Sequence, residues 1–102
     1  MKRAAVVVNP TKIKKMPEFR RHVEQVMRSY GWAAPLWLET TVDDPGFGQA
    51  RTAVDQGVDM VAALGGDGTV RNVASGLLDT GIPLGILPAG TGHPVSYTHL
   101  TL

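Results

Sequence analysis

The sequence contains no cysteine, which excludes a disulfide framework and a thiolate metal site. Charge of neither sign dominates, because ten Lys and Arg residues stand against nine Asp and Glu residues, so no nucleic-acid partner is expected. The apolar runs, such as residues 4–8 and 60–64, are far shorter than the roughly 20 residues of a membrane-spanning helix. No second histidine stands at metal-ligand spacing from His22, so we expect no metal site built from protein side chains alone.

What is present fits a soluble globular protein. Hydrophobic residues make up 43% of the chain and charged residues 19%, which is ordinary for this class. The length of 102 residues suits one domain and not two. With no signal peptide recognised at the N-terminus, we expect the protein to be cytoplasmic.

Four segments predict strands, and the run at residues 4–8 is apolar without polar alternation, as in strands that are buried on both faces. The four segments cover residues 4–8, 35–40, 60–64 and 82–87. Between them, three segments carry apolar residues at helical spacing. The first helix begins near Pro17 and is capped by Gly31, the second covers residues 49–56 and is capped by Gly57, and the third follows residue 69. The apolar face of the third helix is expected to extend to Leu78, and the apolar face of the first helix is expected to extend to Tyr30.

The resulting order, β-α-β-α-β-α-β, predicts an α/β fold with a three-layer, Rossmann-like parallel sheet. Ligands of such sheets bind at the carboxyl ends of the strands. Turns rich in Gly, Pro or Thr follow three of the four strands, at residues 9–11, 65–69 and 88–92. We therefore expect these turns to gather on one rim and to form the binding site.

The best-marked turn is Gly65-Gly66-Asp67-Gly68-Thr69, between a buried strand and a helix. Glycine can adopt positive φ and lets the backbone approach a ligand closely. Successive amides and the following helix N-terminus then suit a phosphate. Each hydrogen bond to a charged phosphate contributes roughly 1.5–3 kcal/mol, against about 0.3–1 kcal/mol for the helix dipole. Amide hydrogen bonds are therefore expected to contribute most of the binding.

Two interpretations of Asp67 stay open at this point. Its carboxylate can ligate Mg²⁺ or orient a reacting hydroxyl, or it can cap the helix that follows. Thr69 has the same two alternatives, since its hydroxyl can meet a phosphate or cap the helix.

Three spaced motifs resemble the diacylglycerol kinase catalytic domain family, which includes bacterial lipid kinases and sphingosine kinases. They are Leu64-Gly65-Gly66-Asp67-Gly68-Thr69-Val70, Val8-Asn9-Pro10-Thr11-Lys12 and Leu87-Pro88-Ala89-Gly90-Thr91-Gly92. Residues 39–41 and the loop at 43–46 are similar to the segment in which a threonine of the family meets the nucleotide. That role is assigned to Thr41, with Thr40 as the alternative. Where the family often has Asn-Glu, this chain has Arg71 and Asn72.

The resemblance implies ATP with Mg²⁺ as phosphoryl donor, a lipid alcohol as acceptor, and Asp67 as the catalytic residue. It is also compatible with peripheral contact with a membrane and with a homodimer. The residues it assigns to the nucleotide are Asn9, Pro10, Thr11, Lys12, Ile13, Thr41, Gly65, Gly66, Asp67, Gly68, Thr69, Val70, Arg71, Asn72, Gly90 and Thr91.

The resemblance ends near Gly92. We expect residues 1–92 to be part of a catalytic domain, truncated before its lipid site and general base, and residues 93–102 to be a tail that is not native. Such a fragment is expected to be inactive alone. Two alternatives share the glycine turn: a soluble NAD kinase-like enzyme and a non-catalytic nucleotide-binding fragment.

Overall fold

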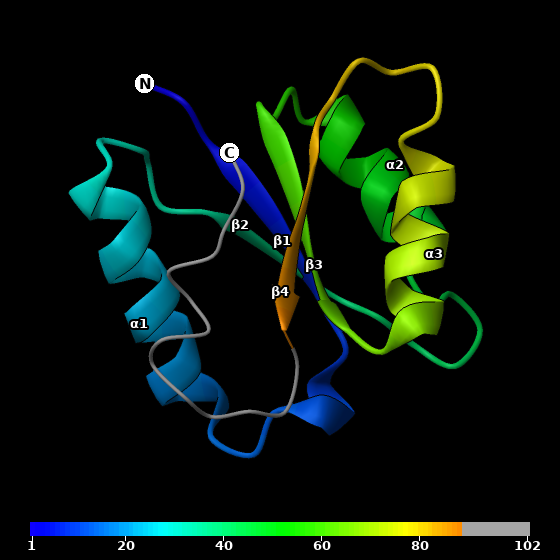
Figure 1. Ribbon diagram of the computed structural model, residues 1–102, viewed down its shortest axis with the longest axis horizontal. Helices are drawn as coiled ribbons and strands as arrows, with labels where there is room; N and C mark the ends of the chain where they lie inside the picture. Colours follow the sequence, from blue (N-terminus) through cyan, green and yellow to red (C-terminus); the bar gives the residue numbers. More distant parts are fainter. Residues whose placement is uncertain (89–102) are drawn as a thin grey trace.

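The structure, a computed structural model, describes residues 1–88 of the chain. It forms a parallel sheet between two layers of helices (Figure 1). The strands are β1 (Ala4–Val8), β2 (Leu36–Glu39), β3 (Met60–Gly65) and β4 (Leu84–Pro88), and the helices are η1, a 3₁₀ turn (Pro10–Lys12), α1 (Met16–Ser29), α2 (Phe47–Asp55) and α3 (Asp67–Gly76).

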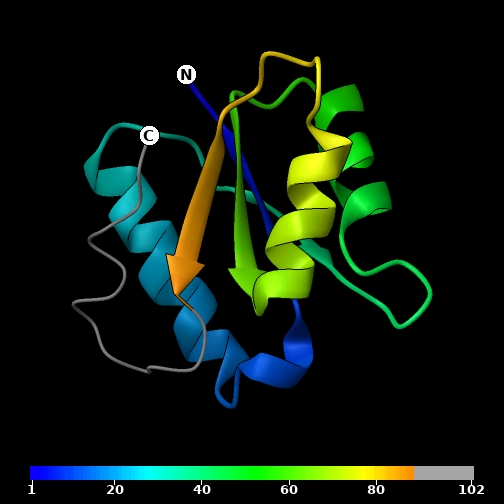
Figure 2. The same cartoon turned by 45° about the vertical axis from the view of Figure 1, so that its right-hand side comes forward.

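The four strands lie in the order β2-β1-β3-β4, and all neighbouring pairs are parallel. Helix α1 covers one face of the sheet, whereas α2 and α3 lie side by side on the other face (Figures 1 and 2). The structure therefore confirms the three-layer, Rossmann-like parallel α/β fold that the sequence predicts. The connection after β1 leads to β2 at one edge of the sheet, and the connection after β3 leads to β4 at the other edge. The point where the strand order reverses therefore lies between β1 and β3.

Both faces of the central strands are buried, which explains why β1 and β3 are apolar without alternation. Successive side chains of a strand point to opposite faces, so each strand divides its residues between two cores. The core under α1 contains Ala4, Val6, Val8, Phe19, Val23, Met27, Met60, Ala62, Leu64 and Leu87. The core under α2 and α3 contains Ala5, Val7, Ala50, Ala53, Val58, Val61, Ala63, Val73 and Leu77.

The prediction of a buried helix face is wrong for two residues. Tyr30 is the C-cap of α1 rather than part of its buried face, and it is 65% exposed. Leu78 follows the C-cap of α3 and is 68% exposed. In both cases the apolar spacing continues past the point where the helix ends. The glycine caps are confirmed, since Gly31 and Gly57 have φ values of 79° and 72° after α1 and α2.

Helices α2 and α3 approach each other at Gly76. A Cβ placed on this glycine would lie 2.8 Å from the Cβ of Ala50 and 2.9 Å from the carbonyl oxygen of Phe47. The missing side chain therefore sets the distance between the two helices. None of the helices in residues 1–88 has the length and apolar character needed to cross a bilayer.

Candidate functional site

A pocket of about 370 Å³ opens where the carboxyl ends of β1 and β2 meet the beginning of α3. This is the edge of the sheet at which parallel α/β proteins bind their ligands, and the volume lies in the range of small-molecule sites. The lining residues come from three segments that are far apart in the sequence: Asn9, Pro10, Thr11, Thr40, Thr41, Val42, Pro45 and Thr69.

The segment after β1 is fixed by Asn9. Its backbone amide donates to the carbonyl oxygen of Leu64 at 2.9 Å, which joins the end of β1 to the end of β3. Its side-chain Oδ1 accepts hydrogen bonds from the amide and the hydroxyl of Thr11, at 3.1 Å and 2.7 Å. Asn9 thus caps η1 and holds Pro10 and Thr11 against the pocket.

The segment after β2 forms a compact loop. The Thr41 amide donates to the Asp44 carbonyl at 3.0 Å, and the Asp44 amide donates back to the Thr41 hydroxyl at 3.0 Å. The Asp44 carboxylate accepts from the amide of Gly48 at 2.9 Å, in the first turn of α2. The loop closes on α3 at Gly46, where a Cβ would lie 3.2 Å from the carbonyl oxygen of Thr69.

Thr40 and Thr69 are the two buried polar residues of the described part of the chain, at 9% and 5% exposure. Both line the pocket. Within residues 1–88 neither hydroxyl has a hydrogen-bond partner, yet neither oxygen belongs to the atoms that are fully shut off from solvent. Buried polar groups are nearly always hydrogen-bonded. Two such hydroxyls that open onto one pocket therefore point to a polar ligand or to water.

The glycine turn lies where the sequence predicts it, but what matters in its glycines is the missing side chain and not a positive φ. Gly65, Gly66 and Gly68 are not among the glycines with positive φ, and Gly66 has φ −81° and ψ −174°. A Cβ on Gly65 would lie 2.5 Å from the Thr69 hydroxyl oxygen, whereas nothing lies within 4 Å of a Cβ placed on Gly66 or Gly68. Contrary to the expectation of positive φ, the turn thus needs one glycine for internal packing and leaves open space beside the other two.

Helix α3 begins inside this turn, at Asp67, with Gly66 as its N-cap and without a side-chain capping bond. Among residues 1–88 no hydrogen-bond acceptor is found for the backbone amides of Asp67, Gly68 and Thr69. Such amides are free to bind an anion. The pocket reaches this first turn through Thr69.

Asp67 is the first residue of α3 and is exposed. Its carboxylate forms no hydrogen bond within the described residues, so the capping interpretation is wrong: Gly66 holds the cap position. A carboxylate in the first turn still interacts favourably with the helix dipole. The other interpretation, a role toward Mg²⁺ or a reacting hydroxyl, stays open.

Several residues that the sequence assigned to the nucleotide do not line the pocket. Lys12 is exposed in η1, while Ile13 and Val70 pack partly buried against the two cores. Arg71 is exposed on α3, and the side-chain amide of Asn72 donates to the Gly68 carbonyl at 2.7 Å. Gly90, Thr91, the domain boundary at residue 92 and the tail at 93–102 lie outside the described residues and stay predictions.

The sequence interpretation missed two pocket residues, Val42 and Pro45, and ranked Thr40 below Thr41. A signal was present, because the Asp-Pro-Gly stretch at residues 44–46 is a turn that follows a strand of a parallel sheet. Counting this turn with the other three at the carboxyl edge would have included the loop.

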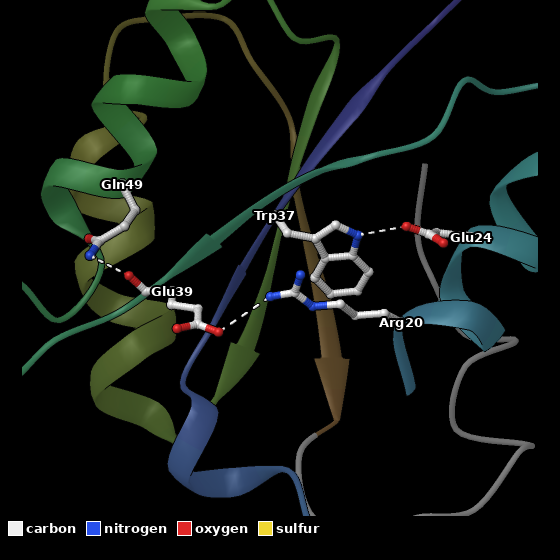
Figure 3. A network of polar contacts seen from close by, with 5 residues as sticks. All are labelled: Arg20, Glu24, Trp37, Glu39 and Gln49. Carbon is white, nitrogen blue, oxygen red and sulfur yellow. Dashed lines mark hydrogen bonds and ion pairs between the residues drawn. The ribbon is translucent and has the colours of Figure 1, made fainter. Parts of the chain in front are cut away.

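A polar network joins this loop to both helical layers (Figure 3). Arg20 of α1 forms an ion pair with Glu39 at 3.3 Å and stacks over Trp37, with its guanidinium 4.9 Å from the ring centre. The Trp37 indole donates to Glu24 at 3.1 Å. From the other face, the Gln49 side chain donates to the Glu39 carbonyl at 3.0 Å. The end of β2 is thus held by α1 and by α2.

The residues present fit a nucleotide. Threonine hydroxyls, prolines and Val42 line the pocket, and unpaired amides begin α3 beside it. Residues 1–88 contain no group of three or more His, Asp or Glu side chains that could hold a metal ion. Mg²⁺ in kinases is held by one or two carboxylates together with phosphate oxygens and water. Asp67 therefore fits Mg²⁺ only as a partner of a phosphate-bearing ligand.

The structure is an α/β domain with a pocket at the carboxyl ends of β1 and β2, beside the beginning of α3. The sequence matches the diacylglycerol kinase catalytic domain over residues 3–100, and the chain belongs to this family. The resemblance carried by the glycine motifs is confirmed.

Two relatives illustrate the match. A diacylglycerol kinase of Bacillus subtilis strain 168 is 34% identical over 96 residues, which cover 89% of this chain and 31% of the relative. A diacylglycerol kinase of Mycobacterium tuberculosis strain H37Rv is 56% identical over 41 residues, which cover 40% of this chain and 13% of the relative. The chain spans about a third of the length of the Bacillus relative.

Proposed function

We propose that this chain is the ATP-binding part of a lipid kinase that transfers the γ-phosphoryl group of Mg-ATP to the hydroxyl of a lipid such as diacylglycerol. Family membership and the names of the relatives support the reaction class. The observation that carries the proposal for this chain is the shared pocket, onto which two buried threonine hydroxyls open beside the unpaired amides of α3.

In this proposal the phosphates bind at the first turn of α3. The amides of Asp67, Gly68 and Thr69 donate to phosphate oxygens, at roughly 1.5–3 kcal/mol for each hydrogen bond to a charged group. The helix dipole adds about 0.3–1 kcal/mol, so the amides contribute most of the affinity. The space beside Gly66 and Gly68 lets the phosphate approach the backbone.

The adenosine lies in the pocket between the segments that follow β1 and β2. Pro10, Val42 and Pro45 supply apolar contact, and the threonine hydroxyls supply hydrogen bonds. Bound Mg²⁺ would neutralise charge on the phosphates, and in this proposal Asp67 is the carboxylate that would hold it or orient the acceptor hydroxyl. Phosphoryl transfer depends mainly on such positioning and charge stabilisation.

We assign no general base and no lipid site to residues 1–88. Because the chain spans 31% of the Bacillus relative, we propose that it binds nucleotide without transferring phosphate on its own. Peripheral contact with a bilayer belongs to the same proposal, since a lipid hydroxyl is presented at a membrane surface. A homodimer stays a prediction.

Two experiments test the proposal. Calorimetric titration of the chain with Mg-ATP should give saturable binding, and the absence of heat at millimolar nucleotide would contradict it. For catalysis, residues 1–88 replace the matching segment of the Bacillus relative in a chimera. Transfer of radiolabelled phosphate to diacylglycerol vesicles is the expected result, and transfer to NAD without transfer to lipid would overturn the assignment of the acceptor.

A further inference from the structure

We infer that Gln49 is a positioning residue for the pocket, because its side-chain amide fixes the two ends of the loop that forms one wall. The inference rests on the proposed function, since a fixed wall affects binding only when a nucleotide lies against it. Gln49 itself does not line the pocket, so any effect on the ligand must pass through the loop.

The geometry of the Gln49 amide is specific. Its Nε2 donates to the carbonyl oxygen of Glu39 at 3.0 Å and to that of Asp44 at 2.9 Å. Both protons of the NH₂ group are therefore used, one at each end of the loop. Between these two carbonyls lie Thr40, Thr41 and Val42, which line the pocket.

The two anchors are themselves held in place. Glu39 is tied to α1 by the ion pair with Arg20 at 3.3 Å (Figure 3), and Asp44 is tied to α2 through the amide of Gly48 at 2.9 Å. The reciprocal bonds between Thr41 and Asp44 make the loop compact, but they do not reach its other end at Glu39. Among the described contacts, Gln49 is the side chain that connects both ends of the loop.

The other end of the Gln49 amide gives a second observation. Its Oε1 is buried and has no hydrogen-bond partner within residues 1–88. An unpaired buried acceptor is costly to the fold, so this residue is not explained by stability alone. The NH₂ group satisfies two carbonyls at the pocket wall while the oxygen stays unpaired within residues 1–88.

The test compares Gln49→Met with Gln56→Met. Methionine keeps the length of the side chain and removes both donors. Gln56 is an exposed glutamine next to α2, and within residues 1–88 its hydrogen bonds involve its backbone. Calorimetry measures the Kd of each variant for Mg-ATP and for inorganic tripolyphosphate. We expect Gln49→Met to weaken Mg-ATP binding about tenfold, as for the loss of about one net hydrogen bond. The affinity for tripolyphosphate should stay within about twofold, because the α3 amides bind it without the loop. Gln56→Met should change neither.

A pH series on Gln49→Glu tests whether the hydrogen bonds that the side chain donates carry the effect. The carboxylate faces two carbonyl oxygens and donates no hydrogen bond, whereas its protonated form donates one. The affinity of Gln49→Glu relative to the wild-type chain at the same pH should therefore recover in part as the pH falls. Gln49→Met carries no titrating group and should show no such recovery.

The outcomes separate the two levels of the proposal. If the wild-type chain does not bind Mg-ATP, the proposed function fails and the role of Gln49 fails with it. If the wild-type chain binds and Gln49→Met binds equally well, only the positioning role is overturned. An equal loss for ATP and tripolyphosphate, together with a lower urea midpoint, would identify Gln49 as a structural residue and would also overturn the inference.

Discussion

Gly65 and Thr69 lie so close that a Cβ on the glycine would be 2.5 Å from the hydroxyl oxygen of Thr69 and 2.7 Å from its Cβ. Thr69 is 5% exposed and lines the pocket from the first turn of α3. The absence of a side chain at the end of β3 therefore decides where this hydroxyl points. The relationship connects a packing constraint inside the turn to the surface that the proposed ligand meets.

The substitution Gly65→Ala should damage both stability and binding. Thr69 has to move away from the new Cβ, and overpacking of this kind costs about 1–3 kcal/mol in the free energy of unfolding. The affinity for Mg-ATP should fall as well, because the hydroxyl leaves its place at the pocket. Urea unfolding and calorimetry measure the two effects, and an unchanged urea midpoint would show that the turn accepts a Cβ.

Gly68→Ala is the matched comparison, because its expected effect on stability has the opposite sign. Nothing lies within 4 Å of a Cβ at this position, which is inside α3. Replacing glycine by alanine in a helix stabilises it by about 0.5–1 kcal/mol. The same Cβ occupies the space proposed for a phosphate, so we expect higher stability with weaker Mg-ATP binding. Higher stability with unchanged affinity would argue that the phosphates bind elsewhere.

Asp67→Asn should separate catalysis from folding. The carboxylate forms no hydrogen bond within the described residues, so the change in unfolding free energy should stay within about 1 kcal/mol, the scale of a helix-dipole interaction. In the chimera with the Bacillus relative, the rate of phosphoryl transfer should fall on the order of 10²-fold, as for the loss of a group that positions a reactant. Normal turnover of the variant would remove Asp67 from the proposed chemistry.

Gly76→Val should separate α2 from α3. Its Cβ would lie 2.8 Å from the Cβ of Ala50, and the extra methyl groups add to the overlap. We expect the free energy of unfolding to fall by about 1–3 kcal/mol or more. Ser75→Val, at the exposed neighbouring position of α3, introduces the same side chain with almost no change in helix propensity and without the contact, so it should lose much less. Equal losses in the two variants would contradict this view of the helix interface.

Arg20→Met should have a small effect. The side chains of the Arg20–Glu39 pair are 35% and 52% exposed, and solvent-exposed ion pairs contribute about 0–1 kcal/mol. Methionine keeps much of the contact with the Trp37 ring and removes the charge. A loss below about 1 kcal/mol that shrinks with added salt is expected from thermal unfolding. A loss of several kcal/mol would mean that the network in Figure 3 holds β2 far more tightly than its exposure indicates.

The fold was predictable because the strongest sequence signals coincide with its most buried parts. The uninterrupted apolar run at residues 60–64 is fully buried from both sides, and the caps Gly31 and Gly57 mark real helix ends. The apolar spacing also predicted Tyr30 and Leu78 as inward-facing. Periodicity alone does not state where the last turn ends, and the chain leaves the helix at both residues.

The site was predictable in its location and less so in its details. Asn9, Thr11 and Thr69 follow strands or begin a helix, and the topology brings them to one pocket. The turn at residues 44–46 is a local signal, but Val42 and Pro45 reach the same pocket because β2 lies next to β1, and the turn does not state which strands are neighbours. The bridge made by Gln49 likewise depends on two carbonyls that face each other only after the loop has folded.

The most direct test of the central claim is a nuclear magnetic resonance titration of the ¹⁵N-labelled chain with Mg-ATP. Binding of the phosphates at the first turn of α3 predicts saturable shifts of the Gly66, Asp67, Gly68 and Thr69 amides. The amides of Thr40 and Thr41 should shift at the same nucleotide concentration. Shifts confined to residues away from this edge of the sheet, or no saturable shift at millimolar Mg-ATP, would contradict it.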